Sequence, residues 1–319
     1  MILCCGEALI DMIPVLDGSD GTAFSARPGG SVFNTAIGLG RLGITSGFLS
    51  GISTDLFGQQ LMRALTESGV DSSPVILSDR PSTLAFVELD NGQARYTFYD
   101  ENTAGRMLNP NDLPPVPETI TALYFGGISL ISEPCADFYA ALIAREHVKK
   151  TIVVDCNIRE NFIGVSTTYL PRLMKIIAHA DVVKVSDDDL NWIYPDNDSL
   201  TDKALRLRAA GPTIVILTLG QDGATAFFGD DQTVSIPAPK VQVVDTIGAG
   251  DTFNSGLLAN LAQQSVLAKS ALRQITGCQI ANALEYAVKV AAITVSRKGA
   301  NPPWAHEIPQ LAKLPLTIS

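Results

Sequence analysis

Short apolar segments alternate with helix-like segments through the second half of the chain, and this alternation constrains the fold more than any other feature. Four segments are rich in β-branched or aromatic residues and end at Gly or polar residues: 121–127, 151–155, 181–185 and 213–220. Such runs are typical of strands buried on both faces of a parallel sheet. With helical patterns at 134–147 and 167–179 between them, they predict a doubly wound α/β fold that binds ligands at the carboxyl ends of its strands.

Further elements are expected on either side of this core. They are strands at 2–6 and 46–52, an antiparallel pair within 223–236, and helices at 31–42, 56–67, 249–263 and 276–296. Asp55 is placed to cap the start of the 56–67 helix, and Gly69 follows its end. We expect the whole chain, residues 1–319, to form one domain.

One segment interrupts the βα alternation. Residues 83–99 contain two β-rich runs separated by Asn91 and Gly92. An Asn-Gly pair between two such runs predicts a β-hairpin. We interpret this hairpin as part of a small separate sheet, a lid that covers the ligand site together with residues at about 12–27.

Charge and composition exclude several classes of protein. The net charge is −10 and no cluster of Lys and Arg exceeds two residues, which argues against a nucleic-acid partner. No apolar run reaches the roughly 18 residues that would suggest a membrane span, and the acidic N-terminus is unlike a signal peptide. The five scattered cysteines favour reduced thiols in a soluble, cytoplasmic protein.

The segment DTIGAGD, residues 245–251, carries the strongest chemical signal. Gly248, Ala249 and Gly250 lead directly into a helix, so a phosphate could approach the backbone N–H groups at its N-terminus. Asp251 would lie in the first helical turn beside that phosphate, where a carboxylate can accept the proton of an attacking hydroxyl. The structural alternative is that Asp251 only complements the helix dipole.

Two other candidates are weaker on their own residues. In PGGSVFN a Gly pair precedes a helix and Asn34 lies in its first turns, but a plain turn with a solvated Asn explains this pattern better. Asp11 follows the first expected strand closely, and an ordinary loop carboxylate explains it about as well as a binding residue does.

Several motifs occur in the order and spacing of the ribokinase-type (phosphofructokinase-B type) carbohydrate kinases, which the chain resembles along nearly its whole length. They are GEALID, PGGSVFN, GISTDLFG, DCNIR, DTIGAGD and VSRKGA. DTIGAGD is highly specific, and the set as a whole favours the base interpretation of Asp251. The resemblance implies the ribokinase-like three-layer fold, with a doubly wound, mostly parallel sheet and a small β-sheet lid. Within the family, GEALIDMIP and YDENTAGRML are most similar to bacterial fructokinases.

The resemblance also implies a role for particular residues. Those implied to hold the sugar are Asp11, Gly30, Asn34 and Arg159, with Asp251 as the base. The backbone N–H groups of Gly248, Ala249 and Gly250 are implied to form an anion hole. The implied ATP site also includes Lys184, Ser186, Thr218, Gly220, Gly223 and Asn282. A monovalent cation such as K⁺ is implied beside the anion hole, with oxygens from Asp245, Ile247, Thr294, Arg297 and Gly299.

Two positions depart from the family pattern. Ser186 and Asp189 occupy the ends of a motif that commonly reads Asn-x-x-Glu. Asp189 can replace the Glu as an indirect, water-mediated Mg²⁺ ligand, because hard cations accept any carboxylate. Asp100 stands where many relatives carry Arg, so a cation near the sugar or the lid is lost.

The activity that follows is the transfer of the ATP γ-phosphoryl group, with Mg²⁺ and a possible K⁺, to a small sugar. Fructose is the expected sugar; 2-keto-3-deoxygluconate kinase, ribokinase and nucleoside kinase are the alternatives. Asp100 argues mildly against the first, and only resemblance separates fructose from ribose. A non-catalytic sugar sensor on the same fold is the alternative from another class. We also expect a homodimer, because two lids packing together would cover an otherwise open sheet.

Overall fold

A computed structural model describes residues 1–15, 23–90, 93–163, 166–308 and 317–318 of the chain. Its centre is a nine-stranded sheet in the order β15-β14-β13-β12-β11-β10-β9-β1-β4. The strands are β1 (Ile2–Cys5), β4 (Ser46–Leu49), β9 (Ala122–Gly126), β10 (Thr151–Asp155), β11 (Val182–Ser186), β12 (Ile214–Thr218), β13 (Ala224–Phe228), β14 (Gln232–Ile236) and β15 (Thr317–Ile318). The six strands from β4 to β12 pair in parallel, and β13 to β15 continue the sheet antiparallel. The mostly parallel sheet is therefore confirmed.

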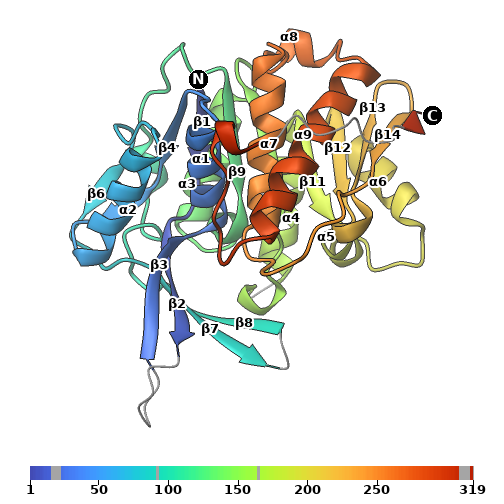
Figure 1. Ribbon diagram of the computed structural model, residues 1–319. Coiled ribbons are helices and arrows are strands. Elements are labelled where there is room, and N and C mark those ends of the chain that lie inside the picture. Colours follow the sequence, from blue (N-terminus) through green and yellow to red (C-terminus); the bar gives the residue numbers. More distant parts are fainter. Residues whose placement is uncertain (16–22, 91–92, 164–165, 309–316, 319) are drawn as a thin grey trace.

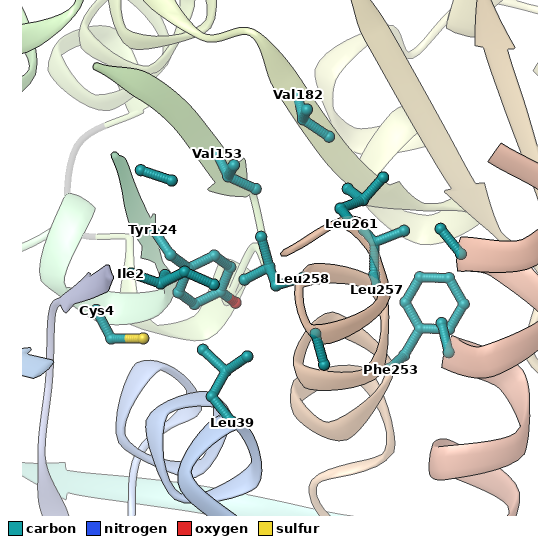
Figure 2. Close-up of a cluster of buried hydrophobic side chains, with 14 of the residues drawn as sticks. Ile2, Cys4, Leu39, Tyr124, Val153, Val182, Phe253, Leu257, Leu258 and Leu261 are labelled. Carbon is teal, nitrogen blue, oxygen red and sulfur yellow. The ribbon is translucent and has the colours of Figure 1, made fainter. Parts of the chain in front are cut away.

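Helices cover both faces of this sheet and make three layers (Figure 1). One face packs against α1 (Ser31–Arg41), α2 (Leu56–Glu67), α7 (Ala249–Gln263), α8 (Lys269–Leu272) and α9 (Gly277–Val295). The other packs against α3 (Cys135–Glu146), α4 (Ser166–His179), α5 (Asp187–Ile193) and α6 (Leu200–Ala209). Figure 2 shows the first of these cores, where Tyr124, Val153 and Val182 of the strands face Leu257, Leu258 and Leu261 of α7. Alternate residues of each strand enter opposite cores, which is why the strands read as continuous apolar runs.

A second sheet of four strands projects from the body (Figure 1). It consists of β2 (Leu9–Val15), β3 (Ala23–Gly29), β7 (Leu84–Asp90) and β8 (Gln93–Tyr99), in the order β3-β2-β7-β8. The β7–β8 pair is the expected hairpin, although Asn91 and Gly92 lie outside the described residues, as do residues 16–22 of the other lid segment. The small lid sheet is confirmed, and Asp11 lies within its strand β2.

The remaining elements are short. A two-stranded sheet joins β5 (Gly51–Ser53) and β6 (Ile76–Ser78), and 3-10 turns occur at Pro110–Asp112, Gly127–Leu130, Glu160–Phe162, Gly220–Asp222 and Ala305–Glu307. Asp55 caps α2 as expected, with its carboxylate accepting the N–H of Gly58 at 2.7 Å. Within the described part of the chain, we find no helix whose length and apolar character would let it span a bilayer.

Candidate active site

Two cavities lie at the carboxyl edge of the parallel strands, on either side of the turn that begins α7. Ile247, Gly248 and Asp251 line a small cavity of about 90 Å³ beneath the lid. Ala249 and Gly250 line a large one of about 980 Å³. The DTIGAGD segment therefore forms the boundary between a small polar space and a space large enough for a nucleotide.

Asp251 lies in the first turn of α7 and is fixed from helix α1. The side-chain amide of Asn34 donates to its Oδ2 at 2.9 Å, and the Thr35 hydroxyl donates to its backbone oxygen at 3.2 Å. Burial raises the pKa of Asp251 to about 7, although the hydrogen bond from Asn34 acts in the opposite direction. A carboxylate with a pKa near neutrality is suited to accepting and releasing a proton.

The backbone before Asp251 depends on glycine. Gly248 is the N-cap of α7 at φ 76°, and a Cβ there would lie 2.7 Å from the Cβ of Ala300. A Cβ at Gly250 would lie 3.5 Å from the Lys184 ammonium nitrogen. This short turn leaves the first N–H groups of α7 without side chains above them, which is the arrangement that an anionic ligand requires.

The lid supplies one wall of the small cavity. Leu9 and Asp11 of β2, with Tyr96 and Phe98 of β8, line this cavity together with Arg159. Burial raises the pKa of Asp11 to about 7. Gly30, the N-cap of α1, also lines the cavity. Its φ of 108° favours glycine, and a Cβ at this position would lie only 2.8 Å from the backbone oxygen of Glu7.

Glu7 is a site residue that the sequence did not reveal. Its buried carboxylate accepts hydrogen bonds from the backbone N–H and hydroxyl of Ser31 and from the N–H of Ser129. A side chain at Gly127 would collide with this carboxylate. The available signal was its place four residues before Asp11 in GEALID, on the connection between β1 and lid strand β2.

The large cavity has both polar and apolar lining residues. Lys184, Ser186, Thr218, Gly220 and Gly223 line it, all five as expected for a nucleotide site. The apolar part of the lining comes from Phe253, Val243, Val288, Ala291, Ala292 and Val295. Phosphates and a planar apolar ring could therefore each find suitable surroundings.

Comparison with known proteins places this site in a family. The model of the pfkB family carbohydrate kinases matches residues 1–307. The chain belongs to the pfkB family. A fructokinase of Rhizobium leguminosarum bv. trifolii is 46% identical over 271 residues, which cover 84% of this chain and 82% of that protein.

Two solved fructokinase structures agree in fold. The fructokinase of Xylella fastidiosa with bound ATP matches with a TM-score of 0.85 at 26% identity, over 94% of this chain and 93% of that one. A double mutant of the Vibrio cholerae fructokinase, solved with fructose, ADP and potassium, matches with a TM-score of 0.82 at 26% identity and the same coverage of both chains.

Two positions singled out by the pfkB resemblance lie outside both cavity linings. Asn282 is exposed on α9 and does not line the large cavity, because the cavity reaches only the later turns of that helix, from Val288 onward. Asp100 does not line the small cavity: it is buried and accepts hydrogen bonds from Thr83 at 2.7 Å and Thr103 at 3.0 Å. Asp100 therefore joins the two ends of the lid hairpin to the body.

Hydrogen bonds join three of the five expected cation residues of the pfkB site. Asp245 accepts the N–H of Ile247 at 3.0 Å and that of Gly299 at 2.8 Å, so these three meet beside the α7 turn. Thr294 is buried at the end of α9, where its carbonyl accepts the N–H of Arg297. The Arg297 guanidinium is ion-paired to Glu307.

Asp189 does not fit an inner-sphere metal ligand. Its carboxylate is buried and already accepts the N–H groups of Ile158 at 2.8 Å and Ser186 at 2.9 Å. The contact with Ser186 is part of the capping box at the start of α5. The described residues hold no cluster of three or more His, Cys, Asp or Glu side chains that could hold a metal. A water-mediated role for Asp189 stays a prediction.

Proposed function

We propose that this protein transfers the γ-phosphoryl group of ATP to fructose, with Asp251 as the base. The observation that carries this proposal is the position of the α7 turn, with Asp251 on the small cavity and Gly250 on the large one. The choice of fructose rests on similarity to the fructokinase of Rhizobium and to the fructokinase structures with bound ATP or ADP. We further propose that residues 1–319 act as one kinase domain.

The geometry supports a direct transfer between the two cavities. A sugar hydroxyl beside Asp251 would lose its proton to Oδ1 or Oδ2 as its oxygen attacks the γ-phosphorus, and the ADP oxygen would leave into the large cavity. The N–H groups of Gly248, Ala249 and Gly250 and the Lys184 ammonium would stabilise charge on the phosphoryl oxygens. The lid would exclude water and so limit hydrolysis of ATP.

Cations complete the proposed chemistry. Mg²⁺, when bound, neutralises charge on the phosphates; the buried Asp189 would act on it only through water. We propose that K⁺ binds beside the α7 turn mainly through backbone oxygens, because the Asp245 carboxylate already accepts the N–H groups of Ile247 and Gly299. The potassium in the Vibrio cholerae structure supports the choice of ion. Four of the five cysteines are buried and unpaired, which supports a reducing compartment such as the cytoplasm.

The charges of the small cavity favour a neutral sugar. Glu7, Asp11 and Asp251 line it against one guanidinium, that of Arg159. Carboxylates accept hydrogen bonds from sugar hydroxyls but repel an acid group, so 2-keto-3-deoxygluconate should bind poorly. The aromatic rings of Tyr96 and Phe98 give apolar contact to the carbon skeleton.

ADP release with ATP and Mg²⁺ should be measured separately with fructose, ribose, 2-keto-3-deoxygluconate, glucose and adenosine. We expect the highest kcat/KM with fructose and the lowest among the sugars with the sugar acid. A higher value with ribose or adenosine would keep the kinase and replace the sugar. Binding of fructose without ADP release would favour a sugar sensor and contradict the proposed activity.

We also propose a homodimer in which the lids pack together. The lid face opposite Asp11 carries Met12, Phe24, Phe86 and Tyr99, since neighbouring residues of a strand point to opposite faces. The rings of Phe24, Phe86 and Tyr99 are in edge contact, and Tyr99 is 57% exposed. An apolar face of this kind is suited to burial against a second copy.

Light scattering at micromolar concentration tests the dimer. We expect the mass of two chains for the natural protein and of one chain for Tyr99→Glu, because a carboxylate would be buried at the contact. Val148→Glu, at an exposed valine just after α3, is the matched control and should remain dimeric. A monomeric natural protein, or a dimeric Tyr99→Glu, would contradict this arrangement.

A further inference from the structure

A line of polar side chains lies inside the otherwise apolar core beneath α7. Tyr124 of β9, Asp155 of β10 and Lys184 of β11 are on the same face of the sheet, and Asp155 and Lys184 are direct neighbours across the strand pair. Figure 2 shows Tyr124 projecting from its strand toward α7, beside Leu258. All three are buried, so each needs a partner within the protein.

Asn254, one turn after Asp251 on α7, provides that partner. Its side-chain amide donates to Asp155 Oδ2 at 2.7 Å and to the Tyr124 hydroxyl at 2.9 Å. The Asp155 carboxylate fixes the orientation of the Asn254 amide, because a flipped amide would place its own oxygen against a carboxylate oxygen. Its own oxygen, Oδ1, is buried without a partner among the described residues. A buried oxygen without a hydrogen bond lowers the stability of the fold, so an Asn at position 254 suggests a role besides packing.

Lys184 connects this line to the large cavity. Its ammonium lies 3.2 Å from Asp155 Oδ1 and donates a hydrogen bond to Oδ2 at 3.5 Å, with side-chain exposures of 7% and 1% for the pair. The same ammonium faces Gly250 in the cavity lining. Burial lowers the pKa of Lys184, but the charges of Asp155, then Asp189 and Asp251, outweigh this effect and hold that pKa above its usual value.

We propose that Asp155 and Asn254 are positioning residues that hold the Lys184 ammonium beneath the anion hole, where it meets the transferred phosphoryl group. Asp155 fixes the ammonium nitrogen, and Asn254 fixes Asp155 relative to the helix that carries Asp251. The Lys184 ammonium and the Asp251 carboxylate are thereby held in a fixed position relative to each other. This inference rests on the proposed kinase activity for the identity of the phosphoryl ligand.

The test combines Asp155→Asn and Lys184→Met, singly and together, with Asn254→Ser. We expect Lys184→Met to lower kcat by about 10²-fold and Asp155→Asn by about tenfold. In the Lys184→Met background, Asp155→Asn should change kcat less than about twofold, because Asp155 acts through the lysine. Asn254→Ser should lower kcat less than Asp155→Asn, since it leaves the ion pair in place. Equal Asp155→Asn effects in both backgrounds would overturn the proposal.

The pH profile separates positioning from stability. In Asp155→Asn a buried ammonium loses its closest negative charge, so its pKa should fall. An alkaline limb of kcat, absent from the natural protein, should then enter the range of about pH 7 to 10. Asp181→Asn is the matched control, because it removes the carboxylate of another partly buried pair, with Lys269, just before β11. Asp181→Asn should lower the stability of the protein and leave the pH profile of kcat unchanged. If Asp155→Asn also leaves that profile unchanged, the inference is contradicted.

Calorimetric binding of a non-hydrolysable ATP analogue gives a readout that does not need turnover. Asp155→Asn and Lys184→Met should weaken its affinity without adding to one another. Absence of ADP release by the natural protein with every sugar would contradict the proposed activity alone. Additive losses of affinity would contradict the positioning inference alone.

Discussion

Replacing Asp251 by Asn is expected to lower kcat by about 10²-fold or more while fructose still binds. Asparagine has the same shape and can still contact Asn34, but it cannot accept the proton of the sugar hydroxyl. The measurement is the steady-state rate of ADP release, with fructose affinity determined separately. An unchanged kcat would exclude Asp251 as the base.

A matched variant tests whether Asp251 only complements the helix dipole. Asp202 lies at the equivalent place in the first turn of α6, is exposed and accepts a hydrogen bond from Ser199. Asp202→Asn should change stability slightly, by about 0.3–1 kcal/mol, and leave kcat unchanged. Similar kinetic losses in both variants would favour the electrostatic explanation.

The same carboxylate predicts the pH dependence of the natural protein. The base must be ionised to accept a proton, and its pKa is raised to about 7 by burial. The value of kcat/KM should therefore fall as the pH decreases through about 7 and be flat above it. Asp11, with a pKa of about 7, titrates in the same range and would steepen this limb. An acidic limb near pH 4 would contradict this environment for Asp251.

Replacing Gly248 by Ala is expected to lower kcat by about 10²-fold, the loss typical of one missing oxyanion donor. The added methyl group would lie 2.7 Å from the Cβ of Ala300, so the turn and its N–H groups must move. The loss should be in kcat more than in KM for fructose, because we propose that the displaced groups contact the phosphoryl oxygens. Steady-state kinetics with both substrates measure it.

Gly43 offers a control with the same backbone angle. It follows α1 at φ 76°, as Gly248 precedes α7, but a Cβ at Gly43 meets nothing within 4 Å. Both alanine variants carry the strain of a left-handed conformation, about 1–2 kcal/mol. Gly43→Ala should therefore lose stability and keep its kinetics. Equal kinetics in the two variants would show that the turn at Gly248 is not an anion hole.

Sequence patterns predicted the elements whose local chemistry and tertiary surroundings agree. The buried strands around 151–155 and 213–220 and the capped helix after Asp55 were found nearly to the residue. The start of α7 was also correct, because three consecutive small residues are typical of a tight turn that leads into a helix. At such places local propensity and packing favour the same structure.

The parts that were missed depend on contacts between distant segments. Strand β2 was not foreseen because it completes a sheet with β7, some 70 positions later, and carries Asp11 and Pro14. Glu7 gave no periodic signal, and its partners Ser31 and Ser129 come from two other connections. The register of α9 against the cavity, which leaves Asn282 outside the lining, cannot be read from its sequence.

The order of strands in the main sheet has a consequence for biosynthesis. From β9 to β14 each new strand docks beside the one made just before it, so this part of the sheet can grow as the chain leaves the ribosome. Helices α7 and α9 are made last, yet they return to cover the face that includes Tyr124 and Val153. A nascent chain therefore exposes that apolar face and cannot hold Asp251 against Asn34 until the final quarter has been synthesised, so its catalytic chemistry begins only with a nearly complete molecule.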